Sequence, residues 1–323
     1  MTTVRRYIDL YESGELDERI DILEKMFTSC SLCPWECRIN RLRGERGICQ
    51  AGLDLTVSKS LPHFGEEPVI SGTGGSGTIF FTFCNLGCSF CQNYQISQDH
   101  LGSPCSPDNL AETMISLQEQ GCHNINLVSP THFLPQIVKS LKLAIPRGLK
   151  LPIVYNSNGY EKSSVLQVLD GIIDIYLPDA KYGNDSWARR LSKAEHYTRY
   201  NLSALSEMHR QVGNLSLNKA GIAERGLIIR HLVLPDNCAQ TETVLKMIKE
   251  HLGTTIHISL MAQYFPAYCA SDHPPIDRKL TLKEYQHCFS LLKTYGFENG
   301  WCQEPEDSAE TFVPDFTKKE SWN

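Results

Sequence analysis

Three cysteines in one short stretch carry the clearest chemical signal in this chain. The stretch reads TIFFTFCNLGCSFCQNY, and its cysteines, Cys84, Cys88 and Cys91, have the spacing C-x3-C-x2-C. Three thiolates this close together can bind one inorganic cluster. They cannot complete the four-ligand shell of a structural zinc site or of an ordinary four-iron cluster. The spacing therefore indicates a metal centre with one open position, where chemistry can occur.

The same loop has two simpler interpretations. One is a zinc site with a fourth ligand from elsewhere, for which His100 is close enough in sequence. The other is three reduced cysteines that bind nothing. The loop directly follows an apolar run, 78–83, which is typical of a buried strand. A specific cysteine spacing at the end of such a strand favours the open metal centre.

A second cysteine group lies upstream in CSLCPWECRINRLRGERGIC. Its members, Cys30, Cys33, Cys37 and Cys49, have the spacing C-x2-C-x3-C-x11-C. Four thiolates can close a tetrahedral zinc site, and they can equally hold a second, fully ligated [4Fe–4S] cluster. The neighbouring arginines would offset the negative charge of either centre; they are Arg38, Arg41, Arg43 and Arg46. We expect a structural role, with substrate binding or electron relay as the alternatives.

Composition limits the class of protein. The 323 residues carry a formal net charge of −6, which argues against nucleic acid as a bulk electrostatic partner. No run of 18 or more apolar residues is present and the first 20 residues contain no apolar signal-peptide core, so we expect neither a transmembrane helix nor export. Thirteen cysteines in a long chain with metal-like spacings indicate a reducing compartment, the cytoplasm.

Short apolar segments alternate with helical patterns after the cysteine loop. The expected strands are 78–83, 124–128, 152–156, 172–177, 227–234 and 255–260. The expected helices are 107–120, 131–144, 163–169, 241–252 and 281–295, with two more before the first cysteine group. This alternation predicts a parallel α/β sheet, either doubly wound and open or a partial barrel.

Polar residues follow the expected strands, at the edge where parallel α/β folds bind ligands. Asn156 and Asn158 end the third strand, and Asp179 and Lys181 follow the fourth. Arg230 lies in the fifth strand, and a planar cationic fork there suits a carboxylate ligand. His231 should point to the opposite face, where we expect it to pack with its hydrogen bonds satisfied.

The cysteine loop, with Phe90 just before the third cysteine, resembles the radical S-adenosylmethionine superfamily. In that family the three cysteines bind a [4Fe–4S] cluster whose unique iron chelates S-adenosylmethionine. One electron cleaves the sulfonium, and the resulting 5′-deoxyadenosyl radical abstracts hydrogen from a substrate. The resemblance implies a partial (β/α)6 barrel of parallel strands, here with an N-terminal helical and cysteine-rich extension. It also implies that Phe90 lies beside the adenine.

The stretches GSGTIFF and CNLGCSFCQNY, with N-x-N-G and D-x-K after later strands, are similar to a group related to pyruvate formate-lyase activating enzyme. This similarity implies that Asn156 and Asn158 approach the ribose or methionine end of S-adenosylmethionine. It implies that Asp179 and Lys181 line the pocket floor and that Arg230 approaches the carboxylate. Where many members have a glycine–glycine–acid stretch, this chain has Ser129, Pro130 and Thr131.

Together these features predict three regions: an N-terminal helical and four-cysteine module (1–70), a radical S-adenosylmethionine partial barrel (71–300) and a C-terminal tail (301–323). We expect an enzyme that cleaves S-adenosylmethionine and takes electrons from a donor such as flavodoxin or ferredoxin. Its substrate could be a protein, a peptide or a small molecule. Alternatives are a glycyl-radical-enzyme activase acting on a partner protein and a non-enzymatic iron–sulfur or zinc redox protein.

Overall fold

The computed structural model describes residues 5–304 and 313–318. A single sheet organises them, with strands β1 Thr56–His63, β2 Ser76–Phe81, β3 Ser103–Pro104, β4 Ile125–Val128, β5 Ile153–Ser157, β6 Ile175–Pro178, β7 Ser216–Leu217, β8 Ala223–Leu232, β9 His257–Met261 and β10 Gly300–Cys302. The spatial order is β10-β9-β8-β6-β5-β4-β2-β1-β3, and β7 pairs with β8. All six expected strands are therefore confirmed.

From β2 to β10 the strands are parallel along this path and follow one another in space as they do in sequence. Successive crossovers thus step in one direction, and the sheet curves as part of a barrel instead of reversing as a doubly wound sheet does. No pairing within the described residues joins β10 to β3, so the barrel is partial. This settles the choice between the two parallel folds.

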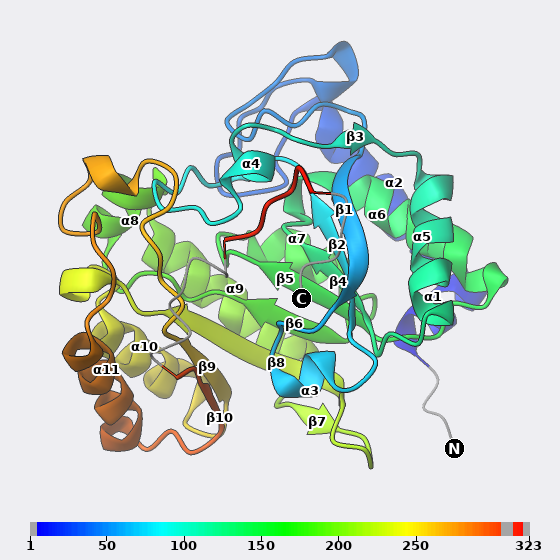
Figure 1. Ribbon diagram of the computed structural model, residues 1–323. Coiled ribbons are helices and arrows are strands. Elements are labelled where there is room, and N and C mark those ends of the chain that lie inside the picture. The colour runs from blue at the N-terminus through cyan, green and yellow to red at the C-terminus, as the bar shows by residue number, and fades with distance from the viewer. Residues whose placement is uncertain (1–4, 305–312, 319–323) are drawn as a thin grey trace.

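The helices are α1 Arg6–Ser13, α2 Glu15–Lys25, α3 Pro68–Ser71, α4 Tyr94–Ser97, α5 Pro107–Glu119, α6 Leu134–Ala144, α7 Ser163–Val168, α8 Asp185–Ser192, α9 Tyr197–Val212, α10 Thr241–Leu252 and α11 Leu282–Tyr295. The longer ones cover the outer face of the sheet, whereas the short helices α3 and α4 pack against residues of its inner face (Figure 1). Two of the expected helices begin with side-chain caps: the Ser106 hydroxyl accepts from the Asn109 amide, and Thr281 and Glu284 form a capping box.

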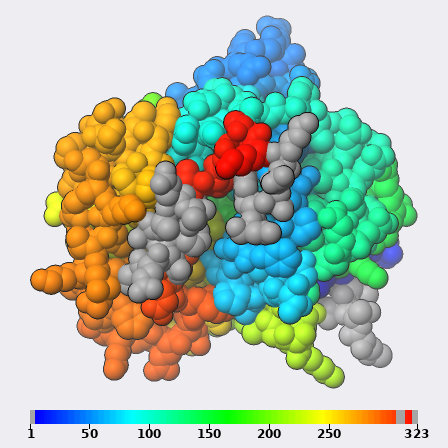
Figure 2. Space-filling view, viewed as in Figure 1, coloured from blue at the N-terminus to red at the C-terminus, as the bar shows by residue number. Residues whose placement is uncertain are grey.

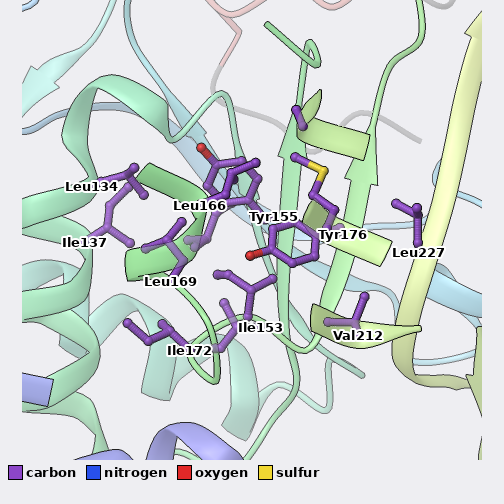
Figure 3. Packing of buried hydrophobic residues seen from close by; sticks show 14 of the residues in the cluster. Leu134, Ile137, Ile153, Tyr155, Leu166, Leu169, Ile172, Tyr176, Val212 and Leu227 are labelled. Atoms are coloured by element: carbon purple, nitrogen blue, oxygen red, sulfur yellow. The ribbon is translucent and has the colours of Figure 1, made fainter. Parts of the chain in front are cut away.

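The two faces of the strands differ in polarity because side chains alternate along a strand. Ile153, Tyr155 and Tyr176 point outward into the main core, where they pack with helix residues such as Leu166 (Figure 3). The inner face carries buried polar side chains among its apolar ones, including Thr78, Asn126, Asn156 and Ser259. The polar set therefore lines the inside of the partial barrel.

Two segments differ from the sequence-based expectation. The six expected strands do not include β1, which is eight residues long and pairs antiparallel with β2. At the other edge, β10 adds a strand parallel to β9. The glycine-rich run before β2 is a tight connection: a Cβ at Gly74 would lie 2.2 Å from the carbonyl oxygen of Gly121.

The C-terminal tail is described at 301–304 and 313–318, and the rest of the region 301–323 lies outside the described residues. Residues 313–318 cross the front of the molecule beside α4 (Figure 2, red). Phe316 is buried there, with its ring centroid 5.4 Å from that of Phe80, and its amide donates to the Gln95 side chain. Among the described residues, no helix is both long and apolar enough to span a membrane.

Candidate functional site

The loop that carries Cys84, Cys88 and Cys91 leaves the carboxyl end of β2 and is held on two sides. The amides of Gly87 and Ser89 donate to the carbonyls of Ser192 and Leu191 at the end of α8, at 3.2 and 2.8 Å. The amide of Cys269 donates to the Ser89 carbonyl at 2.9 Å. These backbone contacts fix the loop, which we call the cluster loop, between α8 and the segment after β9.

Polar groups surround each thiol of the cluster loop. Cys84 Sγ accepts from the Leu86 amide and from Asn158 Nδ2, both at 3.4 Å. The Ser192 hydroxyl donates to Cys88 Sγ at 2.9 Å, and Cys91 Sγ lies 3.2 Å from the hydroxyl of Ser97. Donors aimed at sulfur are the environment that tunes an iron–sulfur cluster.

Burial, followed by the nearby charge of Cys88, raises the pKa of Cys84 to about 12 and that of Cys91 to about 11. The three sulfurs are therefore close enough to influence one another and would stay protonated without a cation. A bound metal centre would convert them to thiolates. Among residues 5–304 and 313–318, no three His, Cys, Asp or Glu side chains converge on a single-ion site.

A cube-shaped cluster fits this arrangement better than a single ion does. Around one zinc ion, with Zn–S near 2.3 Å, tetrahedral geometry puts the sulfurs about 3.8 Å apart. A [4Fe–4S] cluster binds each thiolate through a different iron, so its sulfurs stand farther apart. Three neighbouring thiols that do not converge on one point, with donors at their sulfurs, match the cluster and leave one iron without a cysteine.

Of the predicted cofactor residues, Phe90 and Asn158 contact this loop directly. Phe90 is buried beside Tyr264, with the ring centroids 5.8 Å apart. Asn158 Nδ2 donates to Asn85 Oδ1 at 2.7 Å as well as to Cys84. Asn85 is itself buried, and its Nδ2 donates to the Tyr160 carbonyl. The spacing pattern alone did not mark Asn85, which lies between two cysteines as an ordinary loop residue.

The other four predicted residues form one ionic network inside the barrel. Arg230 donates through Nε to Asp179 Oδ1 at 3.1 Å and through a terminal nitrogen to Asn156 Oδ1 at 2.5 Å. Lys181 Nζ pairs with Asp179. Although burial opposes the shift, Asp179 and then the thiol of Cys88 raise the pKa of Lys181. This network therefore extends from Arg230 to the vicinity of the cluster loop.

Sequence reasoning missed two carboxylates in this network. Glu66 and Glu67 lie between β1 and α3, in a segment expected to be loop. Glu66 accepts from Asn126 at 2.9 Å and lies 3.4 Å from Arg230, and Glu67 is buried. Burial raises the pKa of both carboxyls, and Arg230 works against the shift. Arg230 is thus shared among three acidic groups of the protein.

Thr131 and His231 face the protein interior. The Thr131 hydroxyl donates to Glu161, and burial raises the pKa of Glu161 to about 8. The ring nitrogens of His231 lie 2.5 Å from the Ala180 carbonyl and 2.9 Å from the Thr241 hydroxyl, so the expected packing role of His231 is confirmed. The hydroxyl of Thr131 is therefore engaged by a protein carboxyl group.

The four upstream cysteines come together around one cavity. This four-cysteine module, 30–49, lies above α4 at the top of Figure 1 (blue). This small cavity is lined by Cys30, Cys33, Cys37, Cys49, Arg41 and His132, among others. A Cβ at Gly47 would lie 2.7 Å from Cys37 Sγ, so only glycine allows this approach. Burial, then the charge of Cys49, raises the pKa of Cys33.

Arg41 is the arginine of this module that is buried, with 1% of its surface exposed, whereas Arg38, Arg43 and Arg46 are exposed. Its guanidinium donates to the carbonyls of Gly52 and His132 and lies 4.2 Å from the ring centroid of Phe27. Burial lowers the pKa of Arg41, and the thiols of Cys49 and Cys30 oppose that shift.

Three contacts join the module to the barrel near the cluster loop. Trp35 Nε1 donates to the Asn85 carbonyl at 2.6 Å. Glu36 pairs with Lys162, two residues after Tyr160. Arg41 binds the His132 carbonyl, and the His132 ring in turn lies 2.7 Å from the carbonyl of Thr82, just before the cluster loop. The two cysteine sites are therefore neighbours in the fold.

Comparisons with known proteins agree with these features. The sequence model of the Radical SAM superfamily matches residues 78–222, which include the cluster loop, Asp179 and Lys181. A protein of Methanocaldococcus jannaschii that bears the name Uncharacterized protein MJ0674 is 32% identical over 294 residues, which are 88% of this chain and 80% of that protein.

Solved structures show a more distant likeness. HydG, a maturase of the [FeFe]-hydrogenase, aligns with a TM-score of 0.49 and 14% identity over 71% of this chain and 52% of its own. HydG from Carboxydothermus hydrogenoformans aligns with a TM-score of 0.45 and 15% identity over 66% of this chain and 49% of its own. Methylornithine synthase (PylB) aligns with a TM-score of 0.43 and 13% identity over 66% of this chain and 60% of its own. The chain thus spans about half the length of the HydG structures.

Proposed function

Because the chain belongs to the radical SAM superfamily, we propose that it is an enzyme that binds a [4Fe–4S] cluster at Cys84, Cys88 and Cys91 and reductively cleaves S-adenosylmethionine. When bound, the cluster and S-adenosylmethionine supply a 5′-deoxyadenosyl radical that abstracts hydrogen from a substrate. The observation that carries the proposal is the cluster loop itself: three mutually close thiols at the carboxyl end of β2, each beside a hydrogen-bonding group.

The residues around the loop suit the parts of S-adenosylmethionine. Phe90, buried beside Tyr264, offers an aromatic face to the adenine. Asn158 contacts both Cys84 and Asn85, which puts an amide at the rim of the cluster where the ribose or the methionine end would lie. Asn156 belongs to the same strand end and is oriented by Arg230.

The charged network supplies the second part of the proposed site. Lys181 and Asp179 line its floor beside Cys88, and Arg230 provides the cationic fork for the carboxylate of S-adenosylmethionine. Arg230 already pairs with Asp179 and Glu66. The carboxylate of a bound ligand would therefore share this guanidinium with the protein carboxylates. Because it adds a negative charge beside them, ligand binding should favour protonation of Glu66 or Glu67.

The reaction needs one electron and a substrate with an abstractable hydrogen. We propose a flavodoxin or ferredoxin as the donor, and a protein, a peptide or a small molecule as the substrate. A cytoplasmic location suits this chemistry, because all thirteen cysteines are free and a reducing compartment keeps them so.

The test is anaerobic reconstitution with iron and sulfide, followed by dithionite and S-adenosylmethionine. We expect 5′-deoxyadenosine to form with the native chain and not with Cys88→Ala. If the native chain forms no more 5′-deoxyadenosine than that control, the proposed reaction is wrong. A cluster whose EPR signal is the same with and without S-adenosylmethionine would instead support a non-enzymatic redox protein.

A glycyl-radical-enzyme activase is a second candidate. The open sheet favours it: no pairing within the described residues joins β10 to β1 or β3, so the barrel has an unclosed side where a polypeptide loop could enter. This candidate predicts that a partner protein acquires a stable backbone radical in the reaction mixture, detectable by EPR. A product found only in small molecules would count against it.

For the four-cysteine module we propose metal binding as well. Four thiols around one cavity provide a complete ligand set, either for zinc or for a second [4Fe–4S] cluster. Its contacts with Asn85 and with the segment before the cluster loop support a role in holding that loop in place.

A further inference from the structure

We propose that an apolar patch inside the barrel is the seat for an aromatic side chain of a polypeptide substrate, and that the chain's own tail occupies this seat in the present structure. The patch, which we call the aromatic seat, is formed by Leu61, Phe80, Ile96 and Val128, and Phe316 of the tail fills it. This inference rests on the proposed function, since it names the class of substrate that would reach the cluster loop.

The aromatic seat lies at the end of the sheet where the cluster loop begins. Phe80 of β2 pairs in register with Val128 of β4. They stand two positions beyond Thr78 and Asn126, so they share the inner face with those polar side chains. Val128 is the last residue of its strand, and Phe80 precedes Cys84 by four residues. A side chain in the seat is therefore inside the barrel, at the strand ends where parallel α/β folds bind ligands.

The tail is held by contacts that another polypeptide could make. The Phe316 ring is buried, with its centroid 5.4 Å from that of Phe80. Its backbone amide donates to Gln95 Oε1 at 2.8 Å, and Lys59 Nζ donates to the backbone carbonyl of Lys318 at 3.1 Å. The two backbone contacts are available to any sequence, whereas the seat selects a large apolar side chain. Peptide-binding sites combine main-chain hydrogen bonds and side-chain pockets in the same way.

The tail reaches the seat from the opposite edge of the sheet. It follows β10, which is the first strand in spatial order, whereas Phe316 contacts β1 and β2 near the other end of that order. Within the described residues no strand pairing joins these two edges, and residues 313–318 cross the front of the molecule (Figure 2). A polypeptide that enters by the unclosed side and places a side chain in the seat must therefore displace Phe316.

Helix α4 connects the seat to the cluster loop. Gln95, which binds the Phe316 amide, and Ile96, which lines the seat, both belong to this helix. The next residue, Ser97, has its hydroxyl 3.2 Å from Cys91 Sγ. An aromatic side chain in the seat thus packs on a helix that contacts a thiol of the cluster loop, and it would bring the polypeptide that carries it close to the proposed site of reaction.

The test measures peptide binding to the anaerobically reconstituted full-length chain, without S-adenosylmethionine. The probe is a fluorescently labelled peptide with the sequence of residues 313–318, VPDFTK, followed by anisotropy. Phe316→Ala should bind this peptide at least about tenfold more tightly than the native chain does, because its own tail no longer fills the seat. Phe289→Ala, which truncates an exposed phenylalanine on α11, is the control and should match the native chain.

Two changes in the peptide separate the two kinds of contact. Alanine in place of its phenylalanine should weaken binding to Phe316→Ala by at least about tenfold, because the seat stays unfilled. Methylation of the backbone nitrogen of that phenylalanine removes the donor to Gln95 and should weaken binding about two- to tenfold. Equal binding of all three peptides would overturn the seat as a site that recognises polypeptide.

The outcomes distinguish this inference from the proposed reaction. Absence of peptide binding to Phe316→Ala, or equal binding to that variant and to the native chain, would overturn the seat even if the chain forms 5′-deoxyadenosine. Peptide binding as expected, in a chain that forms no 5′-deoxyadenosine, would overturn the reaction and leave the seat standing. If Phe316→Ala loses the native circular dichroism spectrum, a chain that ends at Gln303 replaces it, and loss of that spectrum in both would show that the tail is a fixed part of the fold and would also overturn the seat.

Discussion

The cluster loop and the four-cysteine module lie next to each other but have different surroundings. In the loop, three thiols meet hydrogen-bonding side chains from other elements, Asn158, Ser192 and Ser97, and Lys181 is close by. In the module, four thiols and one arginine enclose a cavity, and the contacts that reach outward come from neighbouring residues such as Trp35. The loop faces ionisable side chains such as Lys181 that can contact a ligand. In the module, by contrast, the thiols and Arg41 face one another across the cavity.

Under the proposed function, the loop is the site that reacts and the module is a site that supports it. A ligand shell short of one cysteine keeps one iron available, and a complete shell does not. The hydrogen bond from Trp35 to Asn85 and the contact between His132 and Thr82 then connect the complete site to the incomplete one. We expect that loss of metal from the module would shift the position of the cluster loop, and would not remove a ligand from the cluster that the loop binds.

The largest expected effect is on activity. Cys88→Ala should reduce 5′-deoxyadenosine formation to background, because the cluster loses one of its three ligands. Cys33→Ala should lower it by no more than about tenfold, equivalent to about 1.4 kcal/mol in the barrier, because this cysteine does not bind the reacting iron. Product is measured by chromatography at equal loop-cluster content. Background activity in Cys33→Ala with a full loop cluster would show that the module also takes part in the reaction.

The next effect compares two buried arginines in the metal-free chain. Arg230→Gln should lower the free energy of unfolding by about 3–5 kcal/mol, because it leaves Glu66 without its cation and Asp179 with Lys181 alone. Arg41→Gln should lower it by less than 1 kcal/mol, or raise it, since no carboxylate balances Arg41. Urea unfolding of both variants measures the difference. Equal losses would indicate that Arg41 has an anionic partner within the protein.

A third effect concerns pH at the junction of the two regions. Glu161 lies between Tyr160, which binds Asn85, and Lys162, which pairs with Glu36. Burial raises the pKa of Glu161 from 4.5 to about 8. The folded chain therefore keeps a proton that the unfolded chain loses, so this residue's contribution to stability is complete below pH 4.5 and declines as the pH rises toward 8.

Glu161→Gln should remove that decline. The variant should gain stability relative to the native chain between pH 5 and pH 8, at about 1.4 kcal/mol per pH unit at most. Denaturant unfolding at several pH values measures the gain, with the exposed Glu119→Gln as the control. A difference that does not change with pH would mean that Glu161 is ionised in the folded chain.

The smallest effect tests one connection between the sites. Trp35→Phe keeps an aromatic ring beside Tyr160 but removes the donor to the Asn85 carbonyl. It should lower the free energy of unfolding by about 1 kcal/mol, the usual contribution of one hydrogen bond. Trp187→Phe on α8 is the matched control. Equal values for the two variants would show that the Trp35 contact adds nothing to stability.

The sequence predicted the elements whose pattern repeats and missed those that depend on a distant partner. Apolar runs marked the strands and helical spacing marked the helices, because both signals are local. The strand β10 is three residues long and exists through its pairing with β9, so no local pattern revealed it. The choice between an open sheet and a barrel also depended on the order of the strands in the sheet, and hydrophobic periodicity along the chain does not predict that order.

In the candidate site, too, the residues marked by a local pattern were predicted and those that depend on distant partners were missed. Cysteine spacing identified both groups of thiols that the fold brings together, since ligands for one centre often cluster in sequence. Glu66 and Glu67 were missed because they enter the barrel from the segment after β1, far in sequence from Arg230. Among the four arginines near the upstream cysteines, spacing did not show which one is buried, because the loop has no regular period. Only the fold brings Arg41 against the cavity.

The contact between Arg41 and His132 has a consequence for biosynthesis. The chain emerges from the ribosome from its N-terminus, so Cys30 is available about 100 residues before the carbonyl that covers Arg41. At about 5–20 residues per second, this interval lasts roughly 5–20 s. During that time the upstream cysteines are accessible to whatever delivers metal, while the barrel that will enclose them is still being made. If the module binds metal as proposed, delivery during translation would therefore meet an open pocket, and delivery after folding would meet a closed one.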